Sequence, residues 1–293
     1  MTIHPWMEIR PSRLKVLGVY SKRAVFRSLN SKPYLSGDLF ADNADYVHMP
    51  LRFRYNRSWH KDLKSAQVIF CPSKNLQEFL QVFGNDISAK VIISGNGDFE
   101  FHEPPIDVPS SVKHLFLQNS FVSDSRFIST LPIGIENFRY GVNGLPWLMG
   151  PGENTVKVKK ILMGPFGLTH PDRISAFKLF SAENGVVDLI SDRTTPKAFA
   201  QKMRSYEFVA AIRGNGVDTH RLWESLYRGA FPILKADQWS QSLEKYELPL
   251  QIIQDWTFEE MEKILLKPQH QFTPSKLESL WWPYWRRLIN SYV

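Results

Sequence analysis

A run of polar residues between two short apolar segments has the composition of an anion-binding loop. The apolar segments, Glu207 to Ile212 and Ala230 to Leu234, have the length of buried strands in a parallel sheet. Between them, a loop with two glycines leads into a helix-length segment that ends at Gly229. Free N–H groups at a helix start bind anions, and arginines bind phosphates. This pattern predicts a diphosphate site built from Arg213, Asn215, Gly216, Asp218, Thr219, His220 and Arg221.

The helix expected over Thr219 to Arg228 has an apolar face and a polar face at about 100° per residue. Asp218 or Thr219 is expected to cap its start. Glu224 lies on the polar face one turn further in, where its carboxylate can accept hydrogen bonds from a sugar diol. The competing interpretation is that the glycines only shape a turn and the polar face is only solvated. The loop is neither a P-loop nor a G-x-G-x-x-G motif, because its order is G-N-G-V-D-T.

The segment from Asp218 to Ile233 resembles the signature of exostosin-like glycosyltransferases. The sequence DTHRLWESLYRGAFPI fits the pattern D-T-x-R-x-W-E-x-L-x-x-G-x-x-P-[IV]. The phrases LFLQN and LPIGIEN, which end at Asn119 and Asn137, are similar to segments of bacterial members, so the resemblance covers roughly residues 33–260. It implies a nucleotide-sugar-dependent, inverting transferase with the two-domain glycosyltransferase B (GT-B) fold.

The resemblance also implies roles for residues outside the signature. In the family, a turn after the first strand of the second domain ends in an arginine that meets the donor phosphates, and Arg173 occupies that place. Gly164 replaces the usual asparagine near the start of this turn. Ser36-Gly37-Asp38 is similar to the start of bacterial exostosin-like chains, although Asp38 also fits an exposed turn in the acidic, turn-rich segment Tyr34 to Asp45.

Inverting sugar transfer requires one base to deprotonate the acceptor hydroxyl, and the nucleotide diphosphate leaves. Asp98 and Asp38 are the candidate bases, and Asp98 is preferred because it directly follows the strand-like run from Val91. The chain has no Asp-x-Asp and no His-x-x-x-His. We therefore expect no metal and no cofactor other than the nucleotide-sugar co-substrate.

Strand and helix patterns alternate along the chain, starting with the strand expected at Lys15 to Tyr20. This order predicts two parallel-sheet, Rossmann-like α/β domains that face one cleft. Residues 1–150 would form the acceptor-side domain and residues 151–273 the nucleotide-sugar-binding domain, with a Gly- and Pro-rich linker at 141–154. Residues 274–293 are expected to form a helix that crosses back to the first domain. Its tryptophans suit packing, with an interfacial membrane anchor as the alternative.

The composition fits a soluble globular protein, with 43% hydrophobic and 22% charged residues among 293. Cys71 is the only cysteine and fits a buried residue of a cytoplasmic protein. No apolar run approaches the ~18 residues of a membrane span, and the N-terminus lacks a secretion signal.

The net charge of +7 is concentrated in residues 1–66, which hold 12 basic and 5 acidic residues. Four explanations compete for this basic excess: binding to an acidic acceptor, to the anionic inner face of a membrane or to nucleic acid, and a basic face that is only solvated. No nucleic-acid motif accompanies the charge, so the expected partners are a nucleotide sugar and a glycan or lipid-linked acceptor. The alternative functions are a non-enzymatic module that binds anions, nucleic acid or a membrane surface, and an epimerase-like nucleotide-sugar enzyme.

Overall fold

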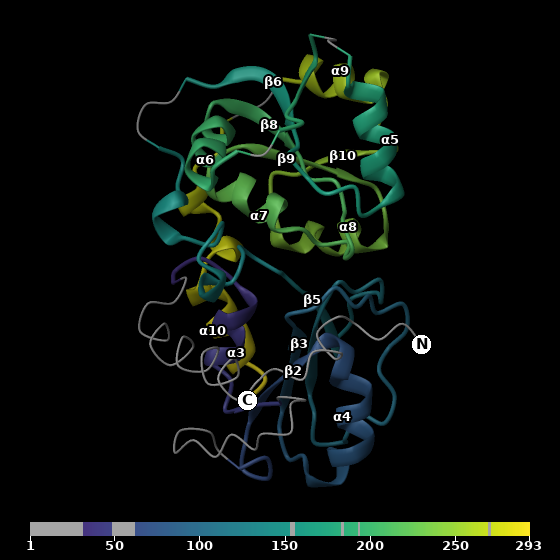
Figure 1. Cartoon of the computed structure of the whole chain (residues 1–293). Helices are drawn as coiled ribbons and strands as arrows, with labels where there is room; N and C mark the ends of the chain where they lie inside the picture. The colour runs from purple at the N-terminus through teal and green to yellow at the C-terminus, as the bar shows by residue number, and fades with distance from the viewer. Residues whose placement is uncertain (1–31, 49–61, 153–155, 183–184, 193, 269–270) are drawn as a thin grey trace, which may run out of the picture.

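Two parallel sheets, each with five strands among the residues that the structure describes, organise the protein. The computed structural model describes residues 32–48, 62–152, 156–182, 185–192, 194–268 and 271–293. The first sheet has the strand order β1-β2-β3-β4-β5 and the second β10-β9-β8-β6-β7, and all neighbours in both are parallel. Figure 1 shows the second sheet with its helices above the first. The predicted pair of Rossmann-like α/β sheets is thus confirmed, while the strand expected at Lys15 to Tyr20 lies outside the described residues.

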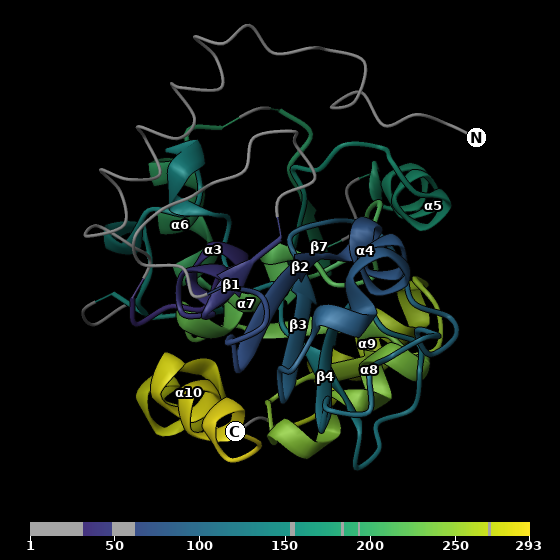
Figure 2. The same ribbon diagram turned by 90° about the horizontal axis from the view of Figure 1, so that it is seen from below.

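The first sheet is covered by helices on both of its faces. Its strands are β1 (Tyr46–Val47), β2 (Val68–Pro72), β3 (Val91–Gly95), β4 (His114–Gln118) and β5 (Ile128–Leu131). Alternate residues of β2 point to opposite faces: Ile69 packs towards α4 (Leu76–Phe83), and Phe70 towards α3 (Gly37–Asp42) and the C-terminal helix. Figure 2 shows α4 on one side of the strands and α3 and α10 (Trp282–Asn290) on the other.

Two local predictions in this half need correction. The segment around Asp38 is the helix α3 and not a turn, because the Ser36 hydroxyl accepts a hydrogen bond from Leu39 N at 3.2 Å and caps it. The sequence from Ser73 to Phe83 predicts an amphipathic helix capped by Ser73. In the structure this segment begins as a 3₁₀ turn, η1 (Ser73–Asn75), and the Ser73 side chain makes no capping bond. A second 3₁₀ turn, η2 (Gly84–Asp86), follows α4.

The second sheet contains the predicted strand-loop-helix-strand unit as β8, α7 and β9. Gly229 follows the helix with a φ of +71°, a conformation that glycine adopts without a Cβ penalty. The strands are β6 (Val158–Met163), β7 (Val187–Leu189), β8 (Tyr206–Ala210), β9 (Phe231–Lys235) and β10 (Gln251–Ile253). The helices are α5 (Pro171–Phe180), α6 (Pro196–Arg204), α7 (His220–Tyr227), α8 (Gln238–Ser242) and α9 (Phe258–Leu266).

The strand order of the second sheet reverses next to β6. The chain passes from β6 outwards to β7 and then returns to the other side of β6 to form β8. Such a reversal opens a crevice outside the carboxyl ends of the two strands, which is where ligands bind in open α/β sheets. The loops that follow β6 and β8 border this crevice.

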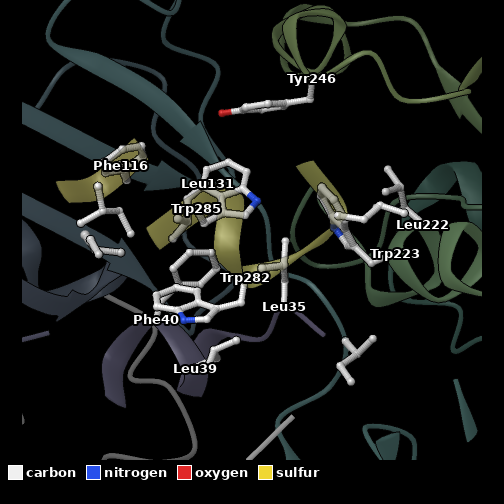
Figure 3. Close-up of a cluster of buried hydrophobic side chains, with 14 of the residues drawn as sticks. Leu35, Leu39, Phe40, Phe116, Leu131, Leu222, Trp223, Tyr246, Trp282 and Trp285 are labelled. Atoms are coloured by element: carbon white, nitrogen blue, oxygen red, sulfur yellow. The ribbon is translucent and has the colours of Figure 1, made fainter. Parts of the chain in front are cut away.

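A continuous apolar cluster joins the two sheets. Figure 3 shows Phe40, Phe116 and Trp285 gathered beneath Tyr246, with Trp223 of α7 on the far side. The Trp285 ring centroid lies 5.8 Å from that of Phe40 and 5.0 Å from that of Tyr246. The aromatic residues of α10 therefore serve packing, and they hold the C-terminal helix against the first sheet. Short 3₁₀ turns lead into and out of this region: η5 (Glu244–Tyr246), η6 (Pro274–Lys276) and η7 (Glu278–Leu280).

In the part of the chain that the structure describes, no helix is both long enough and apolar enough to cross a membrane.

Truncation of Trp285 to alanine should lower the free energy of unfolding by about 3–5 kcal/mol, because it opens a cavity in the cluster that joins the sheets. Urea denaturation measures the change. Trp147→Ala is the matched control, since that indole is 68% exposed and its loss should change stability by less than about 0.5 kcal/mol. Equal losses in both variants would contradict the assigned packing.

Candidate functional site

The loops at the carboxyl ends of the two sheets contact each other. Arg213, which follows β8, forms an ion pair with Glu100, which follows β3. In the same loops Asn215 Nδ2 donates to Asp98 Oδ2 at 3.3 Å. His220 Nδ1 lies 2.8 Å from the carbonyl oxygen of Gly134, beyond β5. Because a carbonyl only accepts, His220 carries its proton on Nδ1 and leaves Nε2 as the acceptor when the ring is neutral. The predicted loop residues thus lie at the junction of the sheets.

Asp218 ties the start of α7 to the first sheet. Its Oδ2 accepts from the backbone N of Ile133 at 2.7 Å, and its Oδ1 accepts from Trp223 Nε1 at 2.8 Å. Its own backbone N donates to Asn119 Oδ1 at 3.0 Å. The residue is only 4% exposed, and this burial raises its pKa to about 7, against the lowering effect of its hydrogen bonds. The sequence predicts Asp218 as a ligand residue; in the structure its Oδ2 contacts the first sheet and its Oδ1 contacts Trp223 of the adjoining helix.

The start of α7 retains buried polar atoms without a partner. Thr219 occupies the N-cap position, yet its side chain makes no capping bond, and its Oγ1 is buried without a partner. Neither Asp218 nor Thr219, the two predicted N-cap residues, therefore caps α7 through a side-chain hydrogen bond to the backbone N–H groups of its first turn. Arg213 Nε is likewise buried and unpartnered. The first N–H groups of a helix also lack intrahelical partners. Buried donors of this kind cost free energy unless a ligand or water satisfies them.

Arg173 and Arg221 brace the two loops of the crevice. Arg221 donates from Nη1 to Gly164 O at 2.9 Å and from Nη2 to Pro165 O at 3.0 Å. Arg173 donates from Nη2 to the carbonyl of Ile212 at 3.1 Å. Burial lowers the pKa of both guanidinium groups, that of Arg221 to about 10. Because these partners are neutral carbonyls, the two positive charges are not cancelled by their hydrogen bonds and favour an anion in the crevice.

The glycines of the β8–α7 loop allow close approach to these side chains. A Cβ on Gly214 would lie 2.9 Å from Arg173 Nη2, and one on Gly216 would lie 2.7 Å from Asn119 Nδ2. Side chains at either position would displace the arginine or the asparagine. The two glycines therefore allow close contact with Arg173 of α5 and with Asn119 at the end of β4 in the first sheet.

Glu224 lies inside the molecule. It is 6% exposed, and its Oε2 pairs with Arg228 Nη1 at 3.3 Å across one turn of α7. Glu224 is the residue predicted to bind a sugar diol, and in this structure its carboxylate is paired with Arg228. The polar face that the sequence predicts for α7 is buried because α6 covers it, with Arg228 Nη1 3.2 Å from Met203 Sδ.

The two candidate bases differ in their surroundings. Asp98 is exposed beside Asn215. Asp38 is partly buried, and its Oδ1 accepts from Asn96 Nδ2 at 3.2 Å, while its backbone N donates to Asn137 Oδ1 at 2.7 Å. Asn137 Nδ2 in turn donates to Asn96 Oδ1 at 2.9 Å. The polar network formed by Asp38, Asn96 and Asn137 lies beyond the end of β3.

Sequence reasoning missed the asparagines of this region. Asn96 and Asn119 directly follow β3 and β4 and have φ angles of 57° and 55°, in the left-handed region that asparagine tolerates. Gly37 is required next to Asp38, because a Cβ there would lie 1.9 Å from Asn96 Oδ1. The sequence signal that could have identified Asn96 and Asn119 is their position directly after a buried strand.

Among the residues described, no group of three or more His, Cys, Asp or Glu side chains is arranged to hold a metal ion. A scan against protein-family models gives no match, and a search of curated proteins likewise finds no match.

The pKa of Asp218 predicts a pH-dependent stability. Because its folded pKa is raised above the usual value near 4, its contribution is greatest below pH 4 and is lost as the pH rises towards 7. The free energy of unfolding should therefore fall across this window, by at most about 1.4 kcal/mol per pH unit from this group. Asp218→Asn should lack this component when both proteins are denatured with urea from pH 4.5 to 8. If the free energy of unfolding had the same pH dependence in the wild-type protein and in Asp218→Asn, the raised pKa assigned to Asp218 would be wrong.

Proposed function

We propose that the protein is a glycosyltransferase of the GT-B architecture that transfers a sugar from a nucleotide-diphosphate donor to a hydroxyl of a glycan or lipid-linked acceptor, without a metal and with inversion. The strand-order reversal beside β6 supports a nucleotide site in the second sheet. The resemblance of residues 218–233 to exostosin-like enzymes points to the same chemistry. A cytoplasmic enzyme that associates with an anionic membrane through residues 1–66 fits this proposal.

The observation that carries the proposal is the unpartnered Thr219 Oγ1 at the start of α7, with Arg213 Nε in the same loop. A diphosphate bound there would accept hydrogen bonds from both atoms and from the free N–H groups of the helix start. The ion pair between Arg213 and Glu100 is the contact that an incoming diphosphate would rearrange. Charge from Arg173 and Arg221 behind these loops adds to the attraction.

In this reaction the acceptor oxygen forms a bond to the anomeric carbon while the bond from that carbon to the donor phosphate oxygen breaks. The acceptor proton passes to a carboxylate, and the nucleoside diphosphate leaves with the bonding electron pair. Positive charge at the start of α7 stabilises the leaving group. Asp98 is the preferred base because it faces the β8–α7 loop directly, through Asn215. Asp38 is the second candidate.

The isosteric change Thr219→Val separates a ligand role from a structural one. Since Thr219 Oγ1 has no partner, the change should leave stability unchanged or raise it, by up to about 3 kcal/mol. If the hydroxyl binds diphosphate, affinity should fall about tenfold or more. Thermal shift with nucleoside diphosphates and nucleotide sugars, with magnesium and with EDTA, measures both effects.

The control is Ser94→Ala, which removes another buried, unpartnered hydroxyl within β3 and should leave nucleotide binding unchanged. Undiminished nucleotide binding by Thr219→Val, or no shift with any nucleotide for the folded wild-type protein, would count against the proposal.

Replacement of Asp98 by asparagine should reduce kcat by about 10²–10⁴-fold with little change in donor affinity, because only the base is lost. Asp38→Asn is the comparison. A severe loss in Asp38→Asn with near-normal turnover in Asp98→Asn would transfer the role to Asp38. Turnover would be followed as release of nucleoside diphosphate once a donor is identified by the thermal-shift panel.

A further inference from the structure

An exposed aromatic surface lies on the segment that connects the two sheets. Trp147, in the 3₁₀ turn η4 (Pro146–Leu148), is 68% exposed. Its ring meets Phe138 of the turn η3 (Phe138–Tyr140) edge to face, with centroids 6.0 Å apart and planes at 82°. Tyr140 is 50% exposed. We call the surface formed by Phe138, Tyr140 and Trp147 the aromatic platform.

The backbone under the aromatic platform is fixed. Glu136 Oε2 accepts from the backbone N of Asn143 at 2.7 Å and closes the loop on itself. Gly144 lies so close to it that a Cβ there would be 1.7 Å from Glu136 O. On the other side of Trp147, the carbonyl of Leu148 accepts from Arg204 Nη2 at 2.9 Å and from Arg228 Nε at 3.2 Å. The Trp147 ring is therefore exposed on a rigid support, which favours a binding surface over a loose loop.

The aromatic platform is linked through its backbone to the polar network around Asp38 and to the C-terminal end of α7. Phe138 follows Asn137, which is hydrogen-bonded to the Asp38 backbone and to Asn96. Leu148 follows Trp147, and its carbonyl is held by Arg228, the partner of Glu224 on α7. A molecule whose reacting hydroxyl lies near the carboxylates of the first sheet can thus extend onto the aromatic platform.

We propose that the aromatic platform is a subsite for the acceptor, and that the acceptor is a saccharide chain whose pyranose ring stacks on Trp147. A pyranose presents a face of C–H groups, which packs on an indole, and a rim of hydroxyls, which hydrogen-bond to nearby polar groups. Glu136, which is partly exposed, and Asn143, which is exposed, supply such groups near the rings. The carboxylate of Glu136 speaks against insertion into a bilayer, because placing a charge in hydrocarbon is costly.

The acceptor role rests on the proposed function, but saccharide binding is measurable without a donor. Purified wild-type protein would be tested on an array of neutral and acidic oligosaccharides and on vesicles of phosphatidylcholine with and without phosphatidylglycerol. We expect binding to at least one class of oligosaccharide, with affinity at least tenfold weaker in Trp147→Ala and largely retained in Trp147→Phe. Leu266→Ala, which removes another exposed apolar side chain from α9, should have no effect.

Three results would overturn the subsite. The first is no oligosaccharide binding by the wild-type protein, and the second is equal oligosaccharide binding by Trp147→Ala. The third is vesicle binding by the wild-type protein that is lost in Trp147→Ala but not in Leu266→Ala. Thermal shift with nucleotides on the same variants is the independent readout. Normal nucleotide shifts with no saccharide binding would reject the subsite and leave the proposed function standing. Saccharide binding that depends on Trp147, without any nucleotide shift, would support the subsite as a binding site and reject the transferase.

Discussion

The structure depends on one buried carboxylate. Asp218 begins the segment that leads into α7, and it accepts the backbone N–H of Ile133 from the first sheet and the indole N–H of Trp223 from the second. Its backbone donates to Asn119, at the end of β4. Burying an acid is unfavourable unless hydrogen bonds compensate, and here they come from both halves at once. Asp218 therefore ties the start of α7 to the first sheet, in addition to the apolar cluster that joins the two halves.

This constraint explains why the candidate site is formed before any ligand arrives. The apolar cluster around Trp223, Tyr246 and Trp285 spans the two sheets, so their carboxyl ends are held against each other by packing as well as by Asp218. The first turn of α7 then presents free N–H groups next to loops braced by Arg173 and Arg221. Such preorganised positive charge is what a leaving diphosphate requires. In the proposed transferase, the first sheet and the aromatic platform would determine the specificity for the acceptor.

The central β8–α7–β9 unit could be predicted from the sequence because its signals are local: strand-length apolar runs, a helical period and Gly229. The roles of Asp218 and Glu224 could not, because they depend on distant residues. Asp218 meets Ile133 85 positions earlier in the chain, and Glu224 is buried because α6 packs over α7. Similarly, the asparagine network around Asp38 joins residues 58 and 99 positions apart. The sequence alone does not distinguish a polar residue on a helix face that binds a ligand from one that pairs with another residue inside the protein, because the difference depends on the packing around the helix.

The proposed glycosyltransferase activity requires that the start of α7 holds the diphosphate of a nucleotide donor. A crystal structure of the protein with a nucleoside diphosphate tests this most directly. We expect phosphate oxygens within hydrogen-bond distance of Thr219 Oγ1 and of the first backbone N–H groups of α7, with Arg213 turned from Glu100 towards the ligand. A diphosphate bound elsewhere on the molecule, with Thr219 Oγ1 still unpartnered, would contradict it.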